Sequence, residues 1–550
     1  MLRTARFSRQ AVVAAALIFV FVAVQAFLAA RLNINWDEFW FLERIYRANA
    51  GTLADPFQNF HVHLLGWLAS LPLGAIDQIV AGRFFMLACQ LVALGCLFSI
   101  SLRLTDLKSA LLVVALWFGS SWSLVHGASF RTDALAAALL MAALALLFAG
   151  PRRWRSVLAG CLAAIALLVT VKGAFYLPVF VAAFWHSWQT YGLAQAIRHF
   201  ALAAIALAIA GAGLWLWHSC ALGGWVAAGE LSQTVAVTGG AASRVLGEDE
   251  WFPRSHYALI WFQLGLPTAL AIFAGVALAG RDFFRREDRS LAIIAALSVL
   301  PLLSLLFYRN AFPYFFPFIV LPVMIAALPA IRRLTASQRP LTELTLAAVA
   351  CAVILQIVPY WQSDQVAQRA YTAEIERMFP EPVAYISRST MLPGYPKAGF
   401  FMSTLELENV RRSGRPILAE AIERESPPLL LVNSPAIADA VADREPGEIT
   451  LLPTDRAALR ENYIAHWGDI WVAGKRLEGG SGSFAVVIAG QYTLECVGSR
   501  MVDDLPTECG SAVSIDRGLH RWSGGAAVLR WGRSAPPTRA APAKPIYHPL

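Results

Sequence analysis

The chain has 550 residues, of which 57% are hydrophobic and 15% are charged, and its formal net charge is +8. Because a typical soluble protein carries about 25% charged residues, this composition excludes an ordinary soluble protein and indicates a polytopic membrane protein. The basic residues fall in small groups between apolar runs, a pattern that sets membrane topology and argues against nucleic-acid binding.

The first apolar run covers residues 11–31 and follows the basic stretch MLRTARFSRQ. A run of about 20 apolar residues is long enough to span a bilayer, whereas a cleaved signal peptide has an apolar core of only about 7 to 15 residues. We therefore expect this segment to be a signal anchor with its N-terminus in the cytoplasm.

Further apolar runs of about 16 to 22 residues bring the predicted number of transmembrane helices to eleven. The predicted spans are 11–31, 82–102, 109–126, 133–150, 156–171, 174–188, 199–219, 258–280, 291–307, 312–331 and 341–360. Alternate connections should then collect Arg and Lys on the cytoplasmic side. They do so at Arg3, Arg6 and Arg9, at Arg103 and Lys108, at 151–155, at Arg198, at 281–289 and at 332–339.

This alternation places the first connection, residues 32–81, and everything after about residue 361 on the outer side of the membrane. The stretch LLGWLASLPLGA (64–75) is too short to cross a bilayer, so we expect an interfacial or re-entrant helix there. Residues 1–361 thus form the predicted transmembrane domain.

The C-terminal third has a different pattern. Residues 362–478 alternate short apolar strands, such as PVAYIS and PLLLVNS, with amphipathic stretches, which favours an extracytoplasmic α/β domain. The sequence GGSGS (479–483) resembles a linker, residues 484–533 predict a small β module, and the Pro- and Ala-rich tail 534–550 predicts disorder. Cys496 and Cys509 lie in this polar third, where they either form a disulfide or remain free thiols.

Ionisable residues gather at the outer ends of the predicted spans. A charge inside the bilayer costs at least about 2.5 to 3.5 kcal/mol and is tolerated mainly in a cavity or pathway. The candidates are Asp37, Glu38, His61 and His63 in the first outer connection, Arg131 and Asp133 in the next, then Lys172 and Arg309.

Most of these residues also have a structural interpretation. Lys172 and Arg309 can anchor a helix end at the lipid headgroups. Asp133 can cap the helix that begins there, with Arg131 as its ion-pair partner. His61 and His63 are spaced as a metal pair, but without a third ligand we assign no metal or other cofactor.

The two adjacent acids of the segment NINWDEFWF need separate interpretations. Asn35 and Glu38 have the spacing of a capping box, in which Glu38 satisfies main-chain donors at a helix start. Asp37 can be a first-turn acid favoured by the helix dipole, or it can face a cavity. Because neighbours on a helix point about 100° apart, Asp37 and Glu38 cannot serve one purpose equally.

Together these residues suit a lipid-linked phosphosugar. The cations Arg131, Lys172 and Arg309, with His61 and His63, suit a phosphate group, and aromatic rings such as Trp36 and Tyr314 suit a sugar or an isoprenoid. Asp133 is a further candidate for substrate binding. Transfer of the sugar needs one base for the acceptor hydroxyl and positive charge for the departing phosphate, but no general acid.

Several short motifs resemble the GT-C superfamily of polyprenyl-phosphate-sugar-dependent glycosyltransferases, especially protein O-mannosyltransferases and lipid A aminoarabinose transferases. They are WDE after the first span, HVHLLGWL, RTDALAAALLMAALALL, TVKG and YRNAFPYFFPFIVLP, over roughly residues 5–360. The resemblance implies an inverting transferase with Asp37 as the base and Glu38 in acceptor binding or loop structure. The chain departs from the aminoarabinose transferases at HVHLLGWL, where His61 stands near their phosphate-binding Lys and their two prolines are absent.

The sequence therefore predicts a multi-pass enzyme of a bacterial inner membrane with a periplasmic C-terminal domain. It would move a sugar from a polyprenyl-phosphate donor to an envelope acceptor, such as lipid A, a glycan or a protein. Two alternatives stay open: a glycan ligase or polymerase with a diphosphate-linked donor, and a transporter or flippase. Against transport, the ionisable residues lie at one face rather than in mid-span.

Overall fold

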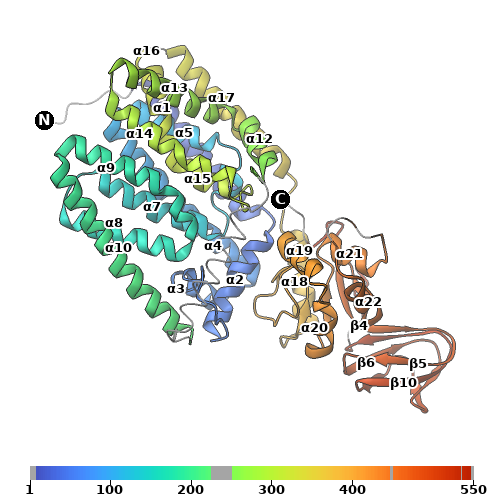
Figure 1. Cartoon of the computed structure of the whole chain (residues 1–550). Coiled ribbons are helices and arrows are strands. Elements are labelled where there is room, and N and C mark those ends of the chain that lie inside the picture. Colours follow the sequence, from blue (N-terminus) through green and yellow to red (C-terminus); the bar gives the residue numbers. More distant parts are fainter. Residues whose placement is uncertain are drawn as a thin grey trace. The chain divides into compact units, whose positions relative to one another are not determined.

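The computed structural model describes residues 8–223, 251–337, 339–445, 447, 450–533 and 535–546. These residues form two compact units, and each is taken in turn below. The first unit comprises Met1–Leu32, Arg47–Pro72 and Asp77–Gln362, and the second comprises Asn33–Tyr46, Leu73–Ile76 and Ser363–Leu550. Figure 1 labels the helices and strands along the chain.

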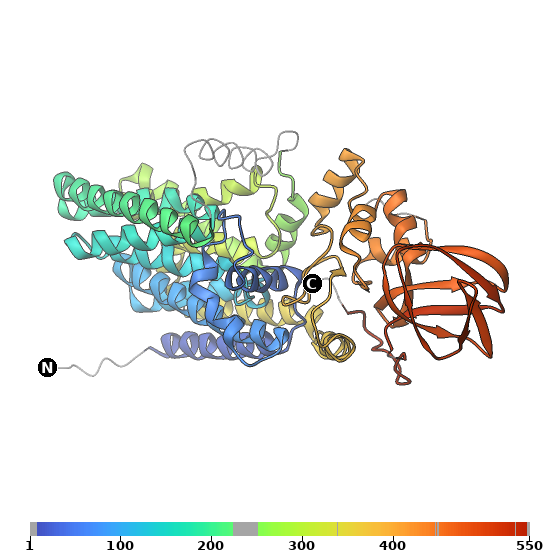
Figure 2. The ribbon, with the colours of Figure 1, turned by 90° about the horizontal axis from the view of Figure 1, so that it is seen from below.

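The first unit is helical (Figures 1 and 2). Its longer helices are α1 (Arg9–Arg31), α4 (Ala75–Leu104), α5 (Leu107–Phe118), α7 (Thr132–Phe148), α8 (Arg153–Val169), α9 (Leu177–Tyr191), α10 (Leu193–Ala221), α12 (Ser255–Leu264), α13 (Leu266–Arg285), α14 (Arg289–Val299), α16 (Leu328–Ser337) and α17 (Arg339–Ile357). Shorter helices join them: α3 (His61–Leu65), η1 (Gly66–Ser70), α6 (Ser123–His126), η2 (Val171–Tyr176), η3 (Leu300–Leu306), α15 (Phe315–Val323), η4 (Met324–Ala327) and η5 (Val358–Tyr360).

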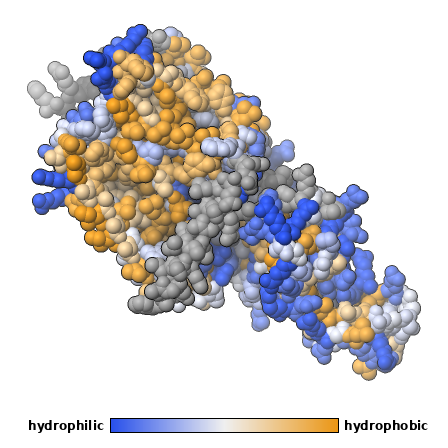
Figure 3. Space-filling view, in the orientation of Figure 1, coloured by the Kyte–Doolittle hydropathy of each residue, from blue (hydrophilic) through white to orange (hydrophobic). Residues whose placement is uncertain are grey.

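Helix packing in this unit depends on small residues. Helices α8 and α10 lie side by side, and a side chain at Gly160 of α8 would collide with the carbonyl of Ala203 and with the Cβ of Ala206 at 2.8 Å. Small residues at such crossings let two backbones approach closely where lipid offers no hydrophobic drive for association. The apolar side chains that do not pack inward, such as Phe19 and Ile209, remain exposed on the outside of the unit, which is largely hydrophobic in Figure 3.

Each of the eleven predicted spans coincides with helix, but the count of eleven is not confirmed. Among the described residues, seven helical segments are long and apolar enough to cross a membrane: Arg9–Arg31, Ala75–Leu104, Leu193–Ala221, Leu266–Arg285, Arg289–Leu306, Phe315–Ala336 and Pro340–Tyr360. Helices α5 and α7 are apolar but shorter. The predicted span 109–126 is interrupted, because Trp122 adopts a left-handed conformation (φ 66°) between α5 and α6. The first unit is thus that of a multi-pass membrane protein.

The second unit combines helices with two β-sheets. Its helices are α2 (Trp36–Asn49), whose residues through Tyr46 belong to this unit, then α18 (Val366–Met378), α19 (Thr404–Ser413), α20 (Ile417–Glu425), α21 (Pro435–Val441) and α22 (Pro453–Asn462). Its strands are β1 (Tyr385–Ile386), β2 (Leu429–Leu431), β3 (Tyr463–Trp467), β4 (Ile470–Leu477), β5 (Gly480–Val486), β6 (Gly490–Glu495), β7 (Ser499–Val502), β8 (Leu505–Glu508), β9 (Ala512–Ile515), β10 (Gly518–Gly524) and β11 (Ala527–Trp531).

Strand β4 connects the two halves of the larger sheet, whose order is β1-β2-β4-β11-β6-β9 with β3 also paired to β4. Its first residues pair with β2 and its later residues with β11, both antiparallel. The smaller sheet has the order β5-β10-β7-β8. One hydrophobic core runs through the unit and includes Leu430, Tyr463, Trp522 and Leu529.

This arrangement differs from the expected domain organisation. The sequence analysis separated an α/β domain (362–478) from a β module (484–533), but both share the larger sheet and one core. The expected linker 479–483 lies largely within β5, which pairs with β10 from Gly480 to Val486. The Gly- and Ser-rich composition of this stretch was therefore a poor indicator of a linker. Strand β10, which is distant in sequence, supplies the main-chain hydrogen bonds that make the stretch a strand.

The tail also differs from its prediction. Among residues 535–546, the carbonyl of Arg539 accepts a hydrogen bond from Trp467 Nε1 at 2.9 Å, and the N–H of Ile546 donates to Asp469 Oδ2 at 2.7 Å. Ile546 is buried. The expected disorder is therefore contradicted for this part of the tail, while residues 547–550 lie outside the described residues.

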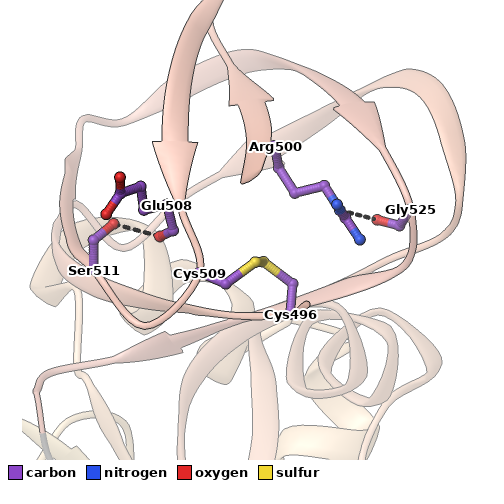
Figure 4. Close-up of a disulfide and its surroundings, with 6 residues drawn as sticks. All are labelled: Cys496, Arg500, Glu508, Cys509, Ser511 and Gly525. Carbon is purple, nitrogen blue, oxygen red and sulfur yellow. Dashed lines mark hydrogen bonds between the residues drawn. A yellow bond between two sulfur atoms is a disulfide. The ribbon is translucent and has the colours of Figure 1, made fainter. Parts of the chain in front are cut away.

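Cys496 and Cys509 form a disulfide, which decides the alternative that the sequence left open (Figure 4). The bridge joins the end of β6 to the end of β8, with 5.1 Å between the two Cα atoms. Nearby main-chain carbonyls accept hydrogen bonds from Arg500 and Ser511, so the surrounding turns are also held by polar contacts.

Candidate active site

The first candidate residues lie at the start of α2. The Oδ1 atom of Asn35 accepts a hydrogen bond from the main-chain N–H of Asp37 at 3.0 Å. The Oε2 atom of Glu38 accepts one from the main-chain N–H of Asn35 at 2.9 Å. These two bonds form a capping box, which satisfies donors that the first turn of a helix leaves without helical partners. The capping interaction expected from the spacing of Asn35 and Glu38 is confirmed.

The two adjacent acids differ in burial. Glu38 has 0% of its surface exposed, whereas Asp37 and its neighbour Trp36 are half-buried. Since successive helical side chains point about 100° apart, the Asp37 carboxylate is directed away from the bond that Glu38 makes. Glu38 thus has a structural use, and the Asp37 side chain is not needed for the cap.

A second group of candidates comes together from three elements of the first unit. Arg131 and Asp133 lie at the start of α7, Lys172 lies in η2, and Tyr314 immediately precedes α15. Asp133 Oδ2 is 3.3 Å from Arg131 Nε, and Asp133 Oδ1 accepts a hydrogen bond from Lys172 Nζ. Helices α7, η2 and α15 pack against one another, which places these side chains side by side. We call these four residues the Asp133 cluster.

The ring of Tyr314 completes the Asp133 cluster. The guanidinium carbon of Arg131 lies 3.4 Å from the ring centroid, and Lys172 Nζ lies 5.4 Å from it. The face of an aromatic ring carries partial negative charge and attracts both cations. The sequence analysis named Tyr314 as a substrate contact but did not foresee this contact with Arg131.

The Asp133 cluster brings two cations to one carboxylate. Arg131 and Asp133 are 8% and 6% exposed, so the ion pairs are held away from water, where a charge is tolerated mainly when it is paired. Guanidinium and ammonium groups are also the usual donors to a phosphate, so Arg131 and Lys172 have the chemistry of an anion site.

A small cavity of about 20 Å³ borders Asp133 and Tyr314. Trp117, His126 and Phe318 also line it. A space of this size holds roughly one water molecule, so it is too small for a sugar ring.

His61 and His63 both lie in α3, but their side chains have different surroundings. His61 is fully buried, whereas His63 is half-buried and its Nε2 lies 2.7 Å from Nδ1 of His218 in α10. The Nε2 atom of His218 is 2.8 Å from the carbonyl oxygen of Pro56. Because a carbonyl only accepts, His218 Nε2 donates to Pro56, and His63 Nε2 then donates to His218 Nδ1.

Burial, together with the neighbouring His218, lowers the pKa of His63. The hydrogen bonds of His63 and His218 and the lowered pKa of His63 both indicate a neutral histidine pair rather than two cations. His218 was not among the predicted site residues, although it stands at the predicted outer end of an apolar run, the same criterion that selected Lys172 and Arg309.

Arg309 follows η3 and is half-buried. Its carbonyl oxygen accepts a hydrogen bond from Arg254 Nε at 3.2 Å, and the guanidinium of Arg254 lies 4.6 Å from the ring centroid of Phe312. Arg254, which precedes α12 and was not predicted as a site residue, is thus a further cation beside Arg309. Within the described residues, no group of three or more His, Cys, Asp or Glu side chains is arranged to hold a metal ion.

No protein-family model and no curated protein sequence matches the chain. Solved structures do resemble it. ArnT from Cupriavidus metallidurans bound to undecaprenyl phosphate has a TM-score of 0.54 at 15% sequence identity, covering 84% of this chain and 97% of that chain. The apo state of the same ArnT gives a TM-score of 0.52 at 15% identity, over 78% of this chain and 94% of that chain.

The archaeal oligosaccharyltransferase AglB from Archaeoglobus fulgidus has a TM-score of 0.48 at 11% identity, over 90% of this chain and 74% of that chain. At these identities the similarity concerns the fold, and the ArnT matches extend over nearly the whole of the ArnT chain. The resemblance to the GT-C glycosyltransferases that the short motifs indicated is therefore confirmed at the level of the fold: this chain has the fold of ArnT.

Proposed function

We propose that this protein is a membrane glycosyltransferase that moves a sugar from a polyprenyl-phosphate donor to an acceptor of the cell envelope. The observation that carries the proposal is the Asp133 cluster, in which the buried Arg131 and the half-buried Lys172 both face the carboxylate of Asp133, within a chain that has the fold of ArnT. A structure of that ArnT contains undecaprenyl phosphate. The guanidinium of Arg131 and the ammonium group of Lys172 would donate to the phosphate of such a lipid.

In this proposal Asp37 is the catalytic base. It would take the proton of the acceptor hydroxyl as the oxygen attacks the anomeric carbon, and the bond from that carbon to the donor phosphate would break. The polyprenyl phosphate leaves as an anion, so Arg131 and Lys172 are assigned to stabilise its charge and no general acid is required. Attack on the face opposite the leaving group inverts the configuration of the sugar.

Glu38 is assigned a structural role, because its carboxylate is already bonded to the main chain of Asn35 and is fully buried. Trp36 and Tyr314 are proposed to contact the sugar or the isoprenoid, and Arg309, His61 and His63 are secondary candidates for the phosphate. The distribution of Arg and Lys favours an active face on the periplasmic side of a bacterial inner membrane.

Two isosteric substitutions test the proposal. Asp37→Asn removes the base and should lower transfer by about 10²- to 10⁴-fold, the usual contribution of general base catalysis. Glu38→Gln is the matched control, because a glutamine at this position still accepts the Asn35 N–H bond and should retain transfer. The measurement is mass spectrometry of envelope lipids and glycans from a deletion strain that expresses the wild type or either variant.

A product that disappears in the deletion strain identifies the sugar and the acceptor. Wild-type levels of that product with Asp37→Asn would remove Asp37 as the base. Loss of the product with both variants would instead return Glu38 to the catalytic residues. Uptake of a solute into vesicles without any lipid-linked donor would favour the transporter alternative.

A further inference from the structure

The segment that carries Asp37 folds with the C-terminal part of the chain, although about 330 residues separate them in sequence. Gln368 of α18 holds both main-chain groups of Ile34. Its Oε1 accepts from the N–H of Ile34 at 2.7 Å, and its Nε2 donates to the carbonyl of Ile34 at 2.8 Å. Ile34 is 0% exposed and Gln368 is 2% exposed, so water does not compete for these bonds.

A second contact fixes the preceding residue. The hydroxyl of Ser363 donates to Asn33 Oδ1 at 2.8 Å and accepts from the N–H of Asn33 at 3.3 Å. Asn33 and Ile34 stand directly before Asn35, the residue that caps α2. The main chain entering α2 is therefore held by three successive residues, two of which bond to the C-terminal part.

A third contact reaches the residue beside Asp37. The guanidinium carbon of Arg388 lies 3.8 Å from the ring centroid of Trp36. Arg388 is itself anchored through its main chain, since its N–H donates to Asn433 Oδ1 at 2.8 Å and its carbonyl accepts from Met402 at 2.9 Å. A cation stacked on an indole is attracted to the ring and restricts its orientation.

Beside α2, the ammonium group of the half-buried Lys397 donates to the carbonyl of Phe400. Burial lowers the pKa of Lys397 to about 7, and the negative charge of Glu43, on α2, acts in the opposite direction. The contacts that hold the start of α2 are therefore those of Asn33, Ile34 and Trp36.

We propose that Gln368 and Arg388 of the C-terminal part are positioning residues for Asp37. This inference rests on the proposed function, in which Asp37 is the base. A base is effective only within hydrogen-bond reach of the proton that it removes, and a displacement of about 1 Å can cost about 10²-fold in rate. Gln368 fixes the main chain before α2, and Arg388 fixes Trp36, whose neighbour is Asp37.

The test uses the full-length protein with Gln368→Leu and Arg388→Ala, and Arg377→Gln as the control. Arg377 lies on the same helix as Gln368 but is largely exposed and pairs with Glu374. Amide hydrogen exchange of peptides covering residues 33–46 measures how firmly the main chain of this segment is fixed. The transfer rate is measured in membranes that contain the native donor and acceptor, and binding of undecaprenyl phosphate to the purified protein is measured separately.

Both test variants should speed amide hydrogen exchange in residues 33–46 at least tenfold and lower the transfer rate at least tenfold. Their binding of undecaprenyl phosphate should stay at the wild-type value. The Arg377→Gln control should keep the wild-type exchange and transfer rates. Arg388→Lys, which keeps a cation near Trp36, should recover part of the rate; a purely structural defect would not be relieved in this way. Arg388→Ala changes no main-chain contact, so it remains informative if Gln368→Leu does not fold.

Two outcomes would overturn the inference: unchanged exchange in 33–46, or faster exchange with a wild-type transfer rate. The exchange measurement does not depend on catalysis. If Asp37→Asn retains transfer while exchange responds as expected, the proposed role of Asp37 fails and the attachment of the segment stands as a structural fact alone.

Discussion

At the scale of single residues, the two adjacent acids of WDE differ in their part in the helix cap. The capping box uses Glu38 and Asn35, and it leaves the half-buried Asp37 carboxylate outside the cap. Sequence spacing was sufficient to predict this division, because a capping box is a local interaction between residues three apart. The Asp133 cluster was only partly predictable, since the Arg131–Asp133 pair is local but Lys172 and Tyr314 reach it through tertiary packing.

Lys172→Met should weaken binding of undecaprenyl phosphate to the purified protein about tenfold or more. The substitution removes one of the two cations of the Asp133 cluster, while Arg131 still pairs with Asp133. A unit charge within a few ångströms contributes several kcal/mol at the effective dielectric of a partly buried site, so a tenfold change is a conservative expectation. Native mass spectrometry in nanodiscs measures the affinity.

The control for this prediction is Lys108→Met, which removes a Lys from the first turn of α5, outside the Asp133 cluster. An equal loss of affinity in both variants would indicate a general effect of net charge. Unchanged affinity in Lys172→Met would exclude Lys172 as a phosphate partner.

His466 of β3 should make the protein less stable in acid. It is 6% exposed, and neither of its ring nitrogens has a hydrogen-bond partner among the described residues. Burial lowers its pKa to about 4, and the nearby positive charge of Arg530 acts in the same direction. The unfolded chain binds a proton near pH 6.5. Between pH 6.5 and 4 only the unfolded state gains this proton, so stability falls as the pH falls through that window.

His466→Phe removes the titrating group and keeps a ring of similar size. The midpoint of thermal unfolding of this variant should therefore fall less steeply between pH 6.5 and 4 than that of the wild type. The corresponding difference in the free energy of unfolding is at most about 3 kcal/mol at pH 4. Scanning fluorimetry across this range measures it. Parallel curves for the two proteins would show that His466 contributes nothing to the acid sensitivity.

At the scale of elements, the periodicity of apolar residues predicted helices and individual strands well, but it did not predict which strands pair with each other. The predicted strands PVAYIS (382–387) and PLLLVNS (428–434) contain β1 and β2. The Gly- and Ser-rich stretch 479–483 lacked any apolar alternation, and its strand character comes from pairing with β10. The attachment of Ile34 to Gln368 was equally beyond prediction, because no local pattern records a contact across about 330 residues.

Removing the Cys496–Cys509 disulfide should destabilise the β6–β8 region. The two cysteines are 13 residues apart, and closing a loop of about 15 residues contributes about 3 kcal/mol in the chain-entropy model. Cys496→Ser should make the loops around the bridge more sensitive to limited proteolysis. Cys351→Ser, which changes an exposed free thiol in α17, is the control. Equal cleavage of both variants would mean that the sheets alone hold this region.

At the scale of the whole molecule, each of the eleven apolar runs predicted as spans overlaps a helix, but among the described residues only seven helical segments are long and apolar enough to cross a membrane, so the count of eleven is not confirmed. Short helices such as α5 and α7 are apolar for reasons of burial as well as of membrane insertion, and composition alone does not distinguish the two. The resemblance of a few short motifs, among them WDE, RTDAL and YRNAFPYFF, was sufficient to predict the fold, which matches that of ArnT. No such motif predicted that residues 33–46 fold with the C-terminal part of the chain.

Membrane orientation gives the last prediction, since it decides on which side transfer would occur. Asp37 belongs to the same unit as residues 363–550, so both must lie on one side of the membrane. The basic alternation assigns that unit to the outer side. It assigns the connection between α13 and α14 to the inner side, where Arg285 ends α13, Arg286 follows it and Arg289 begins α14. A disulfide between Cys496 and Cys509 agrees with an oxidising outer compartment.

Trypsin added to spheroplasts should therefore cleave within residues 363–550 and spare the α13–α14 connection. In inverted membrane vesicles the pattern should reverse. Peptide mass spectrometry of both preparations reads the two sites in a single experiment, so each serves as the control for the other. Cleavage of the C-terminal unit in inverted vesicles alone would place Asp37 on the cytoplasmic side, and the donor would then have to present its sugar there.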